Sequence, residues 1–175
     1  MAHAHPHMWI DGIVDVEFED SGLSNVTVVW LFDEFNSADM IFSLDANLDG
    51  VISSSENEAI RDQAFSHLSR ADYFIVAFAG TRRVDIPDAS RFSASIVDGR
   101  LRYEFDVPLR LEWSDVDDVV FGLFDPSYYI DFVTDAAQTS LALSGRTIQL
   151  SDETLTLESE GWGRIQVAAV KMGLQ

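Results

Sequence analysis

The twelve residues from Asp45 to Glu56, DANLDGVISSSE, constrain the fold most strongly because they match the calcium loop of an EF-hand. Such a loop presents oxygen ligands at positions 1, 3, 5, 7, 9 and 12 and turns at a glycine in position 6. The predicted ligands are the side chains of Asp45, Asn47, Asp49, Ser53 and Glu56 and the carbonyl of Val51, with Gly50 at the turn. The alternative, a chance match in an acidic and serine-rich surface loop, accounts less well for so many positions at once.

An EF-hand loop lies between two helices, and the flanking sequence predicts both of them. The Asn and Ser residues at positions 36–37 are good helix caps, so we expect a first helix that ends at Leu44. Serines at positions 54–55 are expected to cap a second helix that runs to about Ala71. We therefore predict a helical, EF-hand-like segment over residues 36–71.

The remaining sequence has the short alternating runs of apolar and polar residues that are typical of β-strands. A hairpin is predicted around the Asp98-Gly99 turn, and another joins the first two strands. We expect strands over residues 8–19, 26–32, 72–78, 91–107 (the hairpin), 119–124, 128–133, 140–143, 147–150 and 154–157. This pattern favours a mainly β fold, an Ig-like antiparallel β-sandwich with the helix–loop–helix as an insertion, in a single domain over residues 1–175.

The charge and the residue composition exclude several classes of partner and site. The net charge of −19 makes nucleic acid a poor partner, because phosphate binding needs clustered lysine and arginine. There is no cysteine, so any transition metal must be bound by His, Asp or Glu. No apolar run is long enough to span a bilayer, and we expect no membrane insertion.

Three of the four histidines lie at the start of the chain, and His5 and His7 flank Pro6. Ala2-His3-Ala4 has the small-x-small form of a signal-peptidase site, so we expect a signal peptide to have been removed and the mature chain to begin at or near His5. The α-amino group of His5 would then be a further nitrogen ligand beside the two imidazoles. The alternative is that the histidines belong to a solvated tail.

Two metals suit these histidines in different ways. A nitrogen brace formed by the terminus, His5 and His7 suits copper, whereas a tetrahedral Zn²⁺ site needs carboxylates as well. The candidate carboxylates are Asp33, Glu34 and Asp125. We expect Zn²⁺, with Cu, Ni or Co as alternatives.

The other candidate residues give no catalytic pattern. His67 is expected to be an ordinary residue of the second helix, and Asp125-Pro126-Ser127 is foremost a turn sequence. The sequence has no serine nucleophile motif, no glycine-rich phosphate loop and no catalytic zinc helix. We therefore expect a protein that is not an enzyme.

The chain resembles a bacterial family of unknown function whose members are described as periplasmic components of an uncharacterised ABC-type transport system. The stretches that carry the resemblance are His5-Pro6-His7-Met8-Trp9-Ile10, Trp30-Leu31-Phe32-Asp33-Glu34, the loop 45–56, Asp72-Tyr73-Phe74 and Asp125-Pro126-Ser127-Tyr128-Tyr129. The resemblance implies export to the periplasm and an association with transition-metal transport. It maps the family's His-Pro-His onto His5 and His7, and its acidic turn onto Asp33 and Glu34.

Together these observations predict a periplasmic metal-binding accessory protein. It would buffer Zn, Ni, Co or Cu, or deliver the metal to a membrane metal transporter or its binding protein, and it would hold Ca²⁺ as a structural ion. A calcium-dependent protein-interaction module without a transition-metal role is the first alternative. A redox enzyme with a copper histidine brace is the second.

Overall fold

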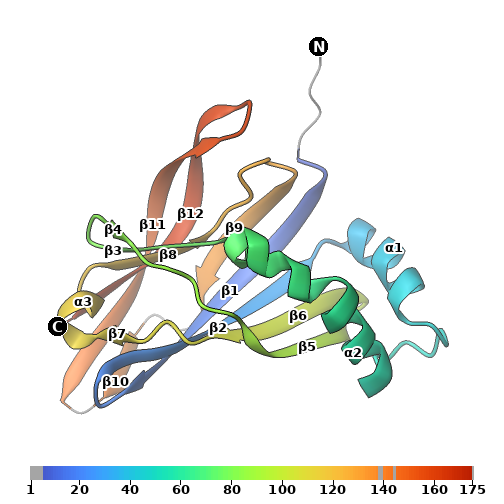
Figure 1. The fold of residues 1–175 in the computed structure, drawn as a ribbon, viewed down its shortest axis with the longest axis horizontal. Coiled ribbons are helices and arrows are strands. Elements are labelled where there is room, and N and C mark those ends of the chain that lie inside the picture. The colour runs from blue at the N-terminus through green and yellow to red at the C-terminus, as the bar shows by residue number, and fades with distance from the viewer. Residues whose placement is uncertain (1–5, 138–139, 144, 175) are drawn as a thin grey trace.

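The computed structural model describes residues 6–137, 140–143 and 145–174, and its architecture is mainly β. Two sheets of six strands each form a sandwich-like arrangement, and helices lie along one side (Figure 1). His5 lies outside the described residues. Within the described chain, no helix is both long enough and apolar enough to cross a membrane.

The first sheet is built around a long hairpin of β1 (Met8–Glu19) and β2 (Gly22–Phe32), as the sequence predicted. The strand order is β5-β6-β2-β1-β9, with β5 at Ser90–Val97, β6 at Arg100–Val107 and β9 at Ile130–Ala136, and the short β7 (Leu111–Glu112) also pairs with β2. The predicted turn between β5 and β6 is present, with positive φ at both Asp98 and Gly99. One pairing departs from an antiparallel sheet, because β1 runs parallel to β9.

The second sheet has the order β10-β11-β12-β8-β3-β4. Its strands are β10 (Ser140–Leu143), β11 (Arg146–Ser159), β12 (Gly163–Leu174), β8 (Val119–Leu123), β3 (Ile75–Ala79) and β4 (Arg82–Arg83). The prediction of separate strands at 147–150 and 154–157 was wrong, since β11 is continuous. The exposed polar residues at 151–153 resemble a turn in sequence, but all three pair in register with β12.

The core lies between the inward faces of the two sheets, where alternate residues of β1 and β2 and all five residues of β8 are buried. Trp30 is its centre and has ring contacts with Phe32, Phe74, Phe105 and Phe132 at centroid distances of 5.2–6.4 Å. Aromatic burial of this kind supplies much of the stability of a sandwich, because each ring removes a large apolar area from water.

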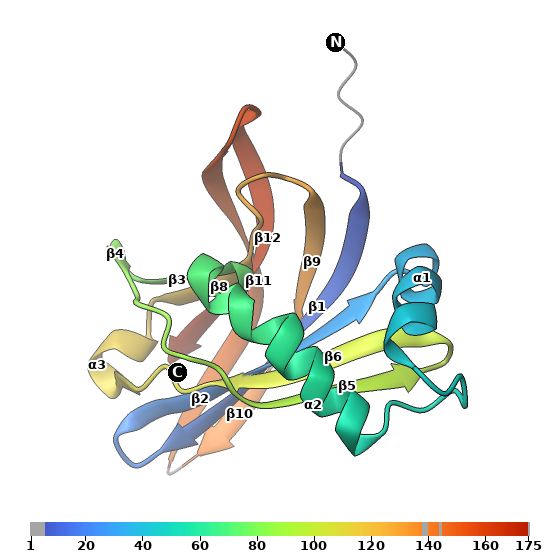
Figure 2. The ribbon, with the colours of Figure 1, turned by 45° about the vertical axis from the view of Figure 1, so that its right-hand side comes forward.

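The two long helices cover the β5–β6 part of the first sheet (Figure 2). α1 spans Glu34–Leu44, and α2 spans Ser54–Gln63. Buried Ser37 of α1 accepts a hydrogen bond from the Leu101 amide of β6 (2.9 Å), and Asn57 of α2 accepts one from the Ala94 amide of β5 (2.9 Å). These polar contacts fix the helical segment on the edge of the sheet.

The second predicted helix was too long, and the following strand begins later than expected. α2 ends at Gln63, and a 3₁₀ segment, η1 (Phe65–Phe74), follows it. Asp72, Tyr73 and Phe74 all have positive φ, a conformation that costs an ordinary residue about 1 kcal/mol or more. The strand predicted from position 72 therefore starts at Ile75.

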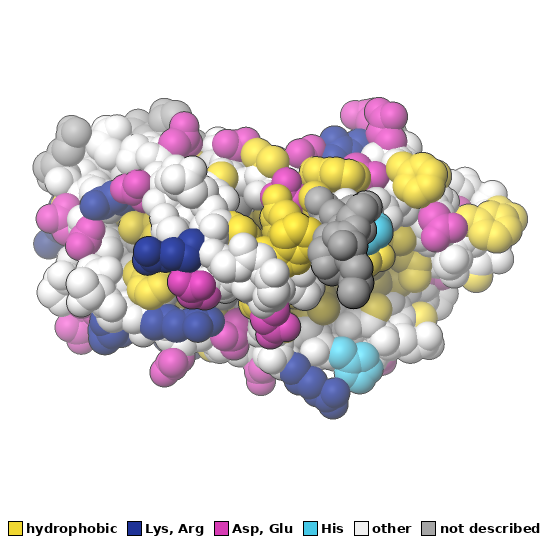
Figure 3. Space-filling view, turned by 90° about the horizontal axis from the view of Figure 1, so that it is seen from above, with side chains coloured by type: hydrophobic (Ala, Val, Ile, Leu, Met, Phe, Trp, Pro, Cys, Tyr) yellow, Lys and Arg dark blue, Asp and Glu magenta, His cyan; other side chains and the backbone are white. Residues whose placement is uncertain are grey.

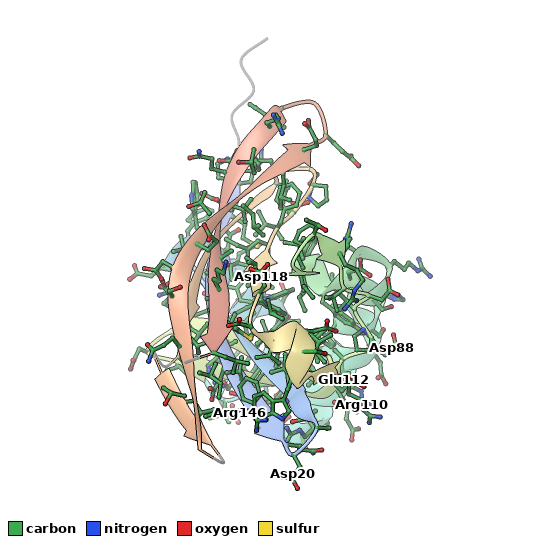
Figure 4. All side chains as sticks on the ribbon, turned by 90° about the vertical axis from the view of Figure 1, so that its left-hand side faces the viewer. Asp20, Asp88, Arg110, Glu112, Asp118 and Arg146 are labelled. Atoms are coloured by element: carbon green, nitrogen blue, oxygen red, sulfur yellow. The ribbon has the colours of Figure 1, made fainter. Side chains whose placement is uncertain are left out.

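The two sheets are joined at one end by the short helix α3 (Trp113–Val116). Trp113 stacks on Phe18 of β1 (5.3 Å between ring centroids) and donates its indole N–H to the carbonyl of Asp20 (2.9 Å). The guanidinium of Arg146, at the start of β11, lies 4.6 Å above the centre of the same indole ring. Figure 4 shows Asp20 and Arg146 at this end of the molecule, so that α3 contacts a strand or turn of each sheet.

Gly22 tests the close packing of β2 against β7. A Cβ atom at this position would lie 2.1 Å from the carbonyl oxygen of Leu111 in β7. Its φ of +140° is also unfavourable for any residue with a side chain. Gly22→Ala should lower the free energy of unfolding by at least about 2 kcal/mol in chemical denaturation. Gly173→Ala, where a Cβ meets nothing within 4 Å, is the matched control and should be close to neutral. Equal stability of the two variants would contradict the β2–β7 packing.

Candidate functional site

The loop between α1 and α2 is organised by the carboxylate of Asp45, which is 2% exposed. Its Oδ1 accepts a hydrogen bond from the Asp49 amide (3.2 Å), and its Oδ2 accepts one from the Gly50 amide (2.8 Å). Gly50 has a φ of +81°, which requires a residue without a side chain or with a small polar one. The carboxylate of Asp45, the first predicted ligand, thus holds the predicted turn at Gly50 in place.

Glu56 closes the loop from its other end. Its Oε1 accepts the Ala46 amide (2.8 Å), and its Oε2 accepts both the amide (2.8 Å) and the hydroxyl (2.7 Å) of Ser53. Ser53, rather than residue 54 or 55, is the N-cap of α2, and with Glu56 it forms a capping box. The Ser53 hydroxyl is the main reason that the pKa of Glu56 is lowered, with the Ser53 and Ala46 amides adding to it.

The two intermediate side chains complete a chain of local contacts. Asn47 accepts from the Asp49 amide (3.1 Å) through Oδ1 and donates from Nδ2 to the Asp49 carboxylate (3.0 Å). Asp49 in turn accepts the Val51 amide (2.9 Å). Five side chains with oxygen donors are therefore gathered within one short loop, and a hard cation such as Ca²⁺ prefers such donors.

The donor set fits Ca²⁺, but its carboxylates are directed at backbone amides in this structure. Among residues 6–137, 140–143 and 145–174, no three His, Asp or Glu side chains are grouped closely enough to hold a metal ion. If both oxygens of Glu56 coordinated an ion, the carboxylate would have to give up its hydrogen bonds with Ala46 and Ser53. The cation would then compete with the capping box for Oε2 and with the Ala46 amide for Oε1.

A second constellation forms where β1 begins and β2 ends, and Asp33 is its centre. Its Oδ1 accepts the Asn36 amide (2.9 Å), and its Oδ2 accepts the Trp9 amide (3.0 Å) and the Asn36 side-chain amide (2.7 Å). Burial alone would raise the pKa of Asp33, but the hydrogen bonds from Asn36, Trp9 and the Phe35 amide outweigh burial and lower the pKa. Asp33 is therefore an ionised carboxylate held beside the N-terminal strand.

His7, among the first residues that the structure describes, is connected to this carboxylate through its backbone. The Asn36 side chain donates to the His7 carbonyl (3.2 Å) as well as to Asp33, so it links the two residues. The His7 amide donates to the Tyr129 carbonyl (2.9 Å), and the His7 and Tyr129 rings are 5.1 Å apart. Glu34 is exposed in the first turn of α1. His5, the other predicted histidine ligand, lies outside the described residues.

Asp125 has a structural task in the turn that leads to β9. It is 6% exposed, and its two oxygens accept hydrogen bonds from Ser127, Tyr129 and Ile130 at 2.8–3.0 Å. This turn places the Tyr129 carbonyl where the amides of His7 and Met8 donate to it. Asp125 thus supports the His7 segment through the backbone.

Two features of this corner were missed by the sequence prediction. The cap of α1 is Asp33, not residue 36 or 37, although aspartate directly before an amphipathic run is a recognised cap signal. Asp131 was not considered, yet it lies opposite Trp9 in the β1–β9 register, and burial raises the pKa of its carboxyl group. No local pattern marks Asp131, because its position depends on a parallel pairing between distant segments.

Fold and site together define a mainly β, sandwich-like protein with a helix–loop–helix segment that packs on the β5–β6 part of the first sheet. The family model described as "Protein of unknown function (DUF1007)" matches residues 1–155, and the chain belongs to this family. It is also similar to the "Uncharacterized 15.5 kDa protein in trpE 3'region" of Spirochaeta aurantia, with 29% identity over 94 residues that cover 54% of this chain and 67% of that protein. No solved structure matches the chain.

Replacing Asp33 should affect stability in a pH-dependent way. Asp33→Ala removes the cap of α1 and its contact with Trp9, and we expect a loss of about 1–2 kcal/mol at neutral pH in urea denaturation. Because the pKa of Asp33 is lowered in the folded chain, this contribution is present above the usual carboxyl value of 3.8 and is lost as the pH falls through the lowered pKa. The difference between wild type and variant should therefore shrink in acid.

The control for this experiment is Asp39→Ala, which removes an exposed carboxylate from the same helix. It should change stability by less than about 0.5 kcal/mol at every pH. A deficit of Asp33→Ala that stayed constant into strong acid would show that the ionised carboxylate is not the stabilising group.

Proposed function

We propose that this chain is a periplasmic metal-binding accessory protein, with a structural Ca²⁺ site in loop 45–56 and a transition-metal site at its N-terminal histidines. The observation that carries the proposal is the link between Asp33 and the His7 segment through Asn36 and Trp9. An ionised carboxylate is thereby held near the backbone of His7, while the His7 imidazole lies against the Tyr129 ring. Such a mixed nitrogen and oxygen donor set suits Zn²⁺, with Cu, Ni or Co as alternatives.

The proposed transition-metal ligands are His7, His5 and Asp33, and Glu34 is a further carboxylate at the same corner. Asp125 acts as the support of the turn below them. The chain would buffer the metal, or pass it to a membrane transporter or to the binding protein of that transporter. This role needs no chemical transformation, which agrees with the expectation that the protein is not an enzyme.

The proposed Ca²⁺ site has the helix–loop–helix context of an EF-hand. Support comes from the arrangement of the ligand residues, since Asp45 and Glu56 bring the two ends of the loop together through the amides of Gly50 and Ala46. A bound cation would replace hydrogen bonds of Asp45 and Glu56 by direct coordination. Its effect would be to stabilise the helical segment and so to fix Asp33 at the beginning of α1.

Calcium binding is tested by thermal unfolding in Ca²⁺ and in chelator. At about 100 times its dissociation constant, a ligand of the native state adds about 2.7 kcal/mol, which corresponds to a rise in Tm of about 5–10 °C for a chain of this size. Asp45→Asn and Glu56→Gln should abolish most of this rise, whereas Glu58→Gln, a neighbouring exposed glutamate, should retain it. Identical melting of the wild type in both conditions would rule out a structural Ca²⁺ site.

Zn²⁺ binding is tested by calorimetric titration of the full chain. The double variant His5→Ala/His7→Ala should bind Zn²⁺ at least about tenfold more weakly than the wild type. His67→Ala is the control for a histidine elsewhere, and His3→Ala is the control for chelation by the chain terminus. If His3→Ala lowers the affinity and the double variant does not, the binding belongs to the terminus and the proposed site is wrong.

A further inference from the structure

The outward side of α1 carries two phenylalanines in water. Phe35 is 84% exposed and Phe42 is 73% exposed, and Ala38 between them is exposed as well. Their spacing of three and four residues places them along one side of the helix. We call these three residues the α1 ridge. Single exposed apolar residues are ordinary, but two nearly bare phenylalanine rings on one helical stripe are typical of a contact surface.

The packing of α1 on the sheet does not need the ridge. Ser37 is fully buried, and Met40, Ile41 and Leu44 are partly buried against the core on the opposite side. The side of α1 that faces the core is therefore already packed against the rest of the chain. Burial of the two phenylalanines would stabilise only a contact with another molecule.

The ridge lies between the two candidate metal sites. At its start, Asn36 directly follows Phe35 and donates to the His7 carbonyl, and at its far end α1 leads into loop 45–56. Two further exposed apolar residues, Leu48 and Val51, follow in this loop at 62% and 61% exposure. Figure 3 shows hydrophobic side chains projecting from the end of the molecule at which Figure 1 places α1, with acidic side chains next to them.

The charge of the helix–loop–helix segment up to residue 60 has one sign, and Arg100 of β6, the strand that α1 contacts, is paired with Asp11 (2.7 Å). Residues 33–60 contain no Lys, Arg or His, and they include seven carboxylates: Asp33, Glu34, Asp39, Asp45, Asp49, Glu56 and Glu58. The next basic residue, Arg61, is already paired with Asp62 (2.9 Å). A second copy of this chain would bring the same carboxylates and a net charge of −19, and an anionic membrane would be repelled in the same way.

We propose that the α1 ridge docks a protein partner that presents an apolar stripe flanked by lysine or arginine side chains, as a cationic amphipathic helix does. The two phenylalanines would be the buried anchors, since aromatic residues dominate the energy of small interfaces. The surrounding carboxylates would attract the partner and orient it. The phenylalanine anchors are not proposed metal ligands, whereas five of the seven carboxylates are: Asp33, Glu34, Asp45, Asp49 and Glu56.

The probes are two synthetic amphipathic peptides of about 18 residues, long enough to form a helix on binding. One is composed of leucine and lysine, and the other has glutamate in place of lysine. The wild-type chain should bind the lysine peptide with an affinity that falls as salt is added, and it should not bind the glutamate peptide. The variant Phe35→Ser/Phe42→Ser should bind the lysine peptide at least about tenfold more weakly.

The matched control is Val97→Ser/Val133→Ser, which removes two exposed apolar side chains from strands of the first sheet. It should bind the lysine peptide as the wild type does. Circular dichroism should show that both double variants are folded, because all four side chains are exposed. Retention of Ca²⁺ and Zn²⁺ binding by the ridge variant would separate this result from the proposed metal function.

Three outcomes would overturn the proposal. The first is equal loss, or no loss, of lysine-peptide binding in the two double variants. The second is self-association of the wild type that disappears in the ridge variant, which would assign the ridge to a second copy. The third is ridge-dependent binding to uncharged phosphatidylcholine vesicles with no binding of the lysine peptide, which would assign the ridge to a lipid surface.

Discussion

The carboxylate of Asp33 is the group on which the junction between the central hairpin and the helical segment depends. It caps α1, receives the amide of Trp9 at the start of β1, and shares the Asn36 side chain with the carbonyl of His7. One charged group thus determines how the central hairpin meets the helical segment. An exposed surface carboxylate would contribute little, but this one is held by four hydrogen bonds that all favour its ionised form.

Local patterns were sufficient to predict the elements that depend on local contacts. The β1–β2 hairpin follows from the alternation of residues 8–19, and the β5–β6 hairpin follows from Asp98-Gly99, whose positive φ angles few other pairs accept. Both helices beside loop 45–56 were predicted as well. The C-terminal end of α1 was predicted correctly, whereas its start and the end of α2 were not. The α1 cap, Asp33, also accepts the distant Trp9 amide.

The errors arose where a distant contact overrides the local preference. Asp72 to Phe74 adopt left-handed backbone, and the compensation comes from packing, since Tyr73 is buried against Phe65 and Phe105 while the Phe74 carbonyl accepts the Phe124 amide (2.7 Å). The parallel pairing of β1 with β9 was also missed because it depends on a contact between segments that are distant in sequence. It could not be foreseen from either segment alone, and it is what brings Asp131 and Tyr129 to the N-terminal corner.

The loop, the corner and the ridge form one mechanical unit, because α1 connects all three. A cation in loop 45–56 would hold the C-terminal end of α1, Asp33 fixes its N-terminal end, and the exposed phenylalanines lie on the rigid helix between them. A rigid helix loses little conformational entropy when it binds, so its apolar side chains can contribute most of their burial energy to a contact. Calcium would then act on docking through the order of α1, while Asp39 and Glu58, the two carboxylates of residues 33–60 that are not proposed ligands, would favour a basic partner. The exposed phenylalanines and the acidic residues of the same helical segment would thus act on one contact.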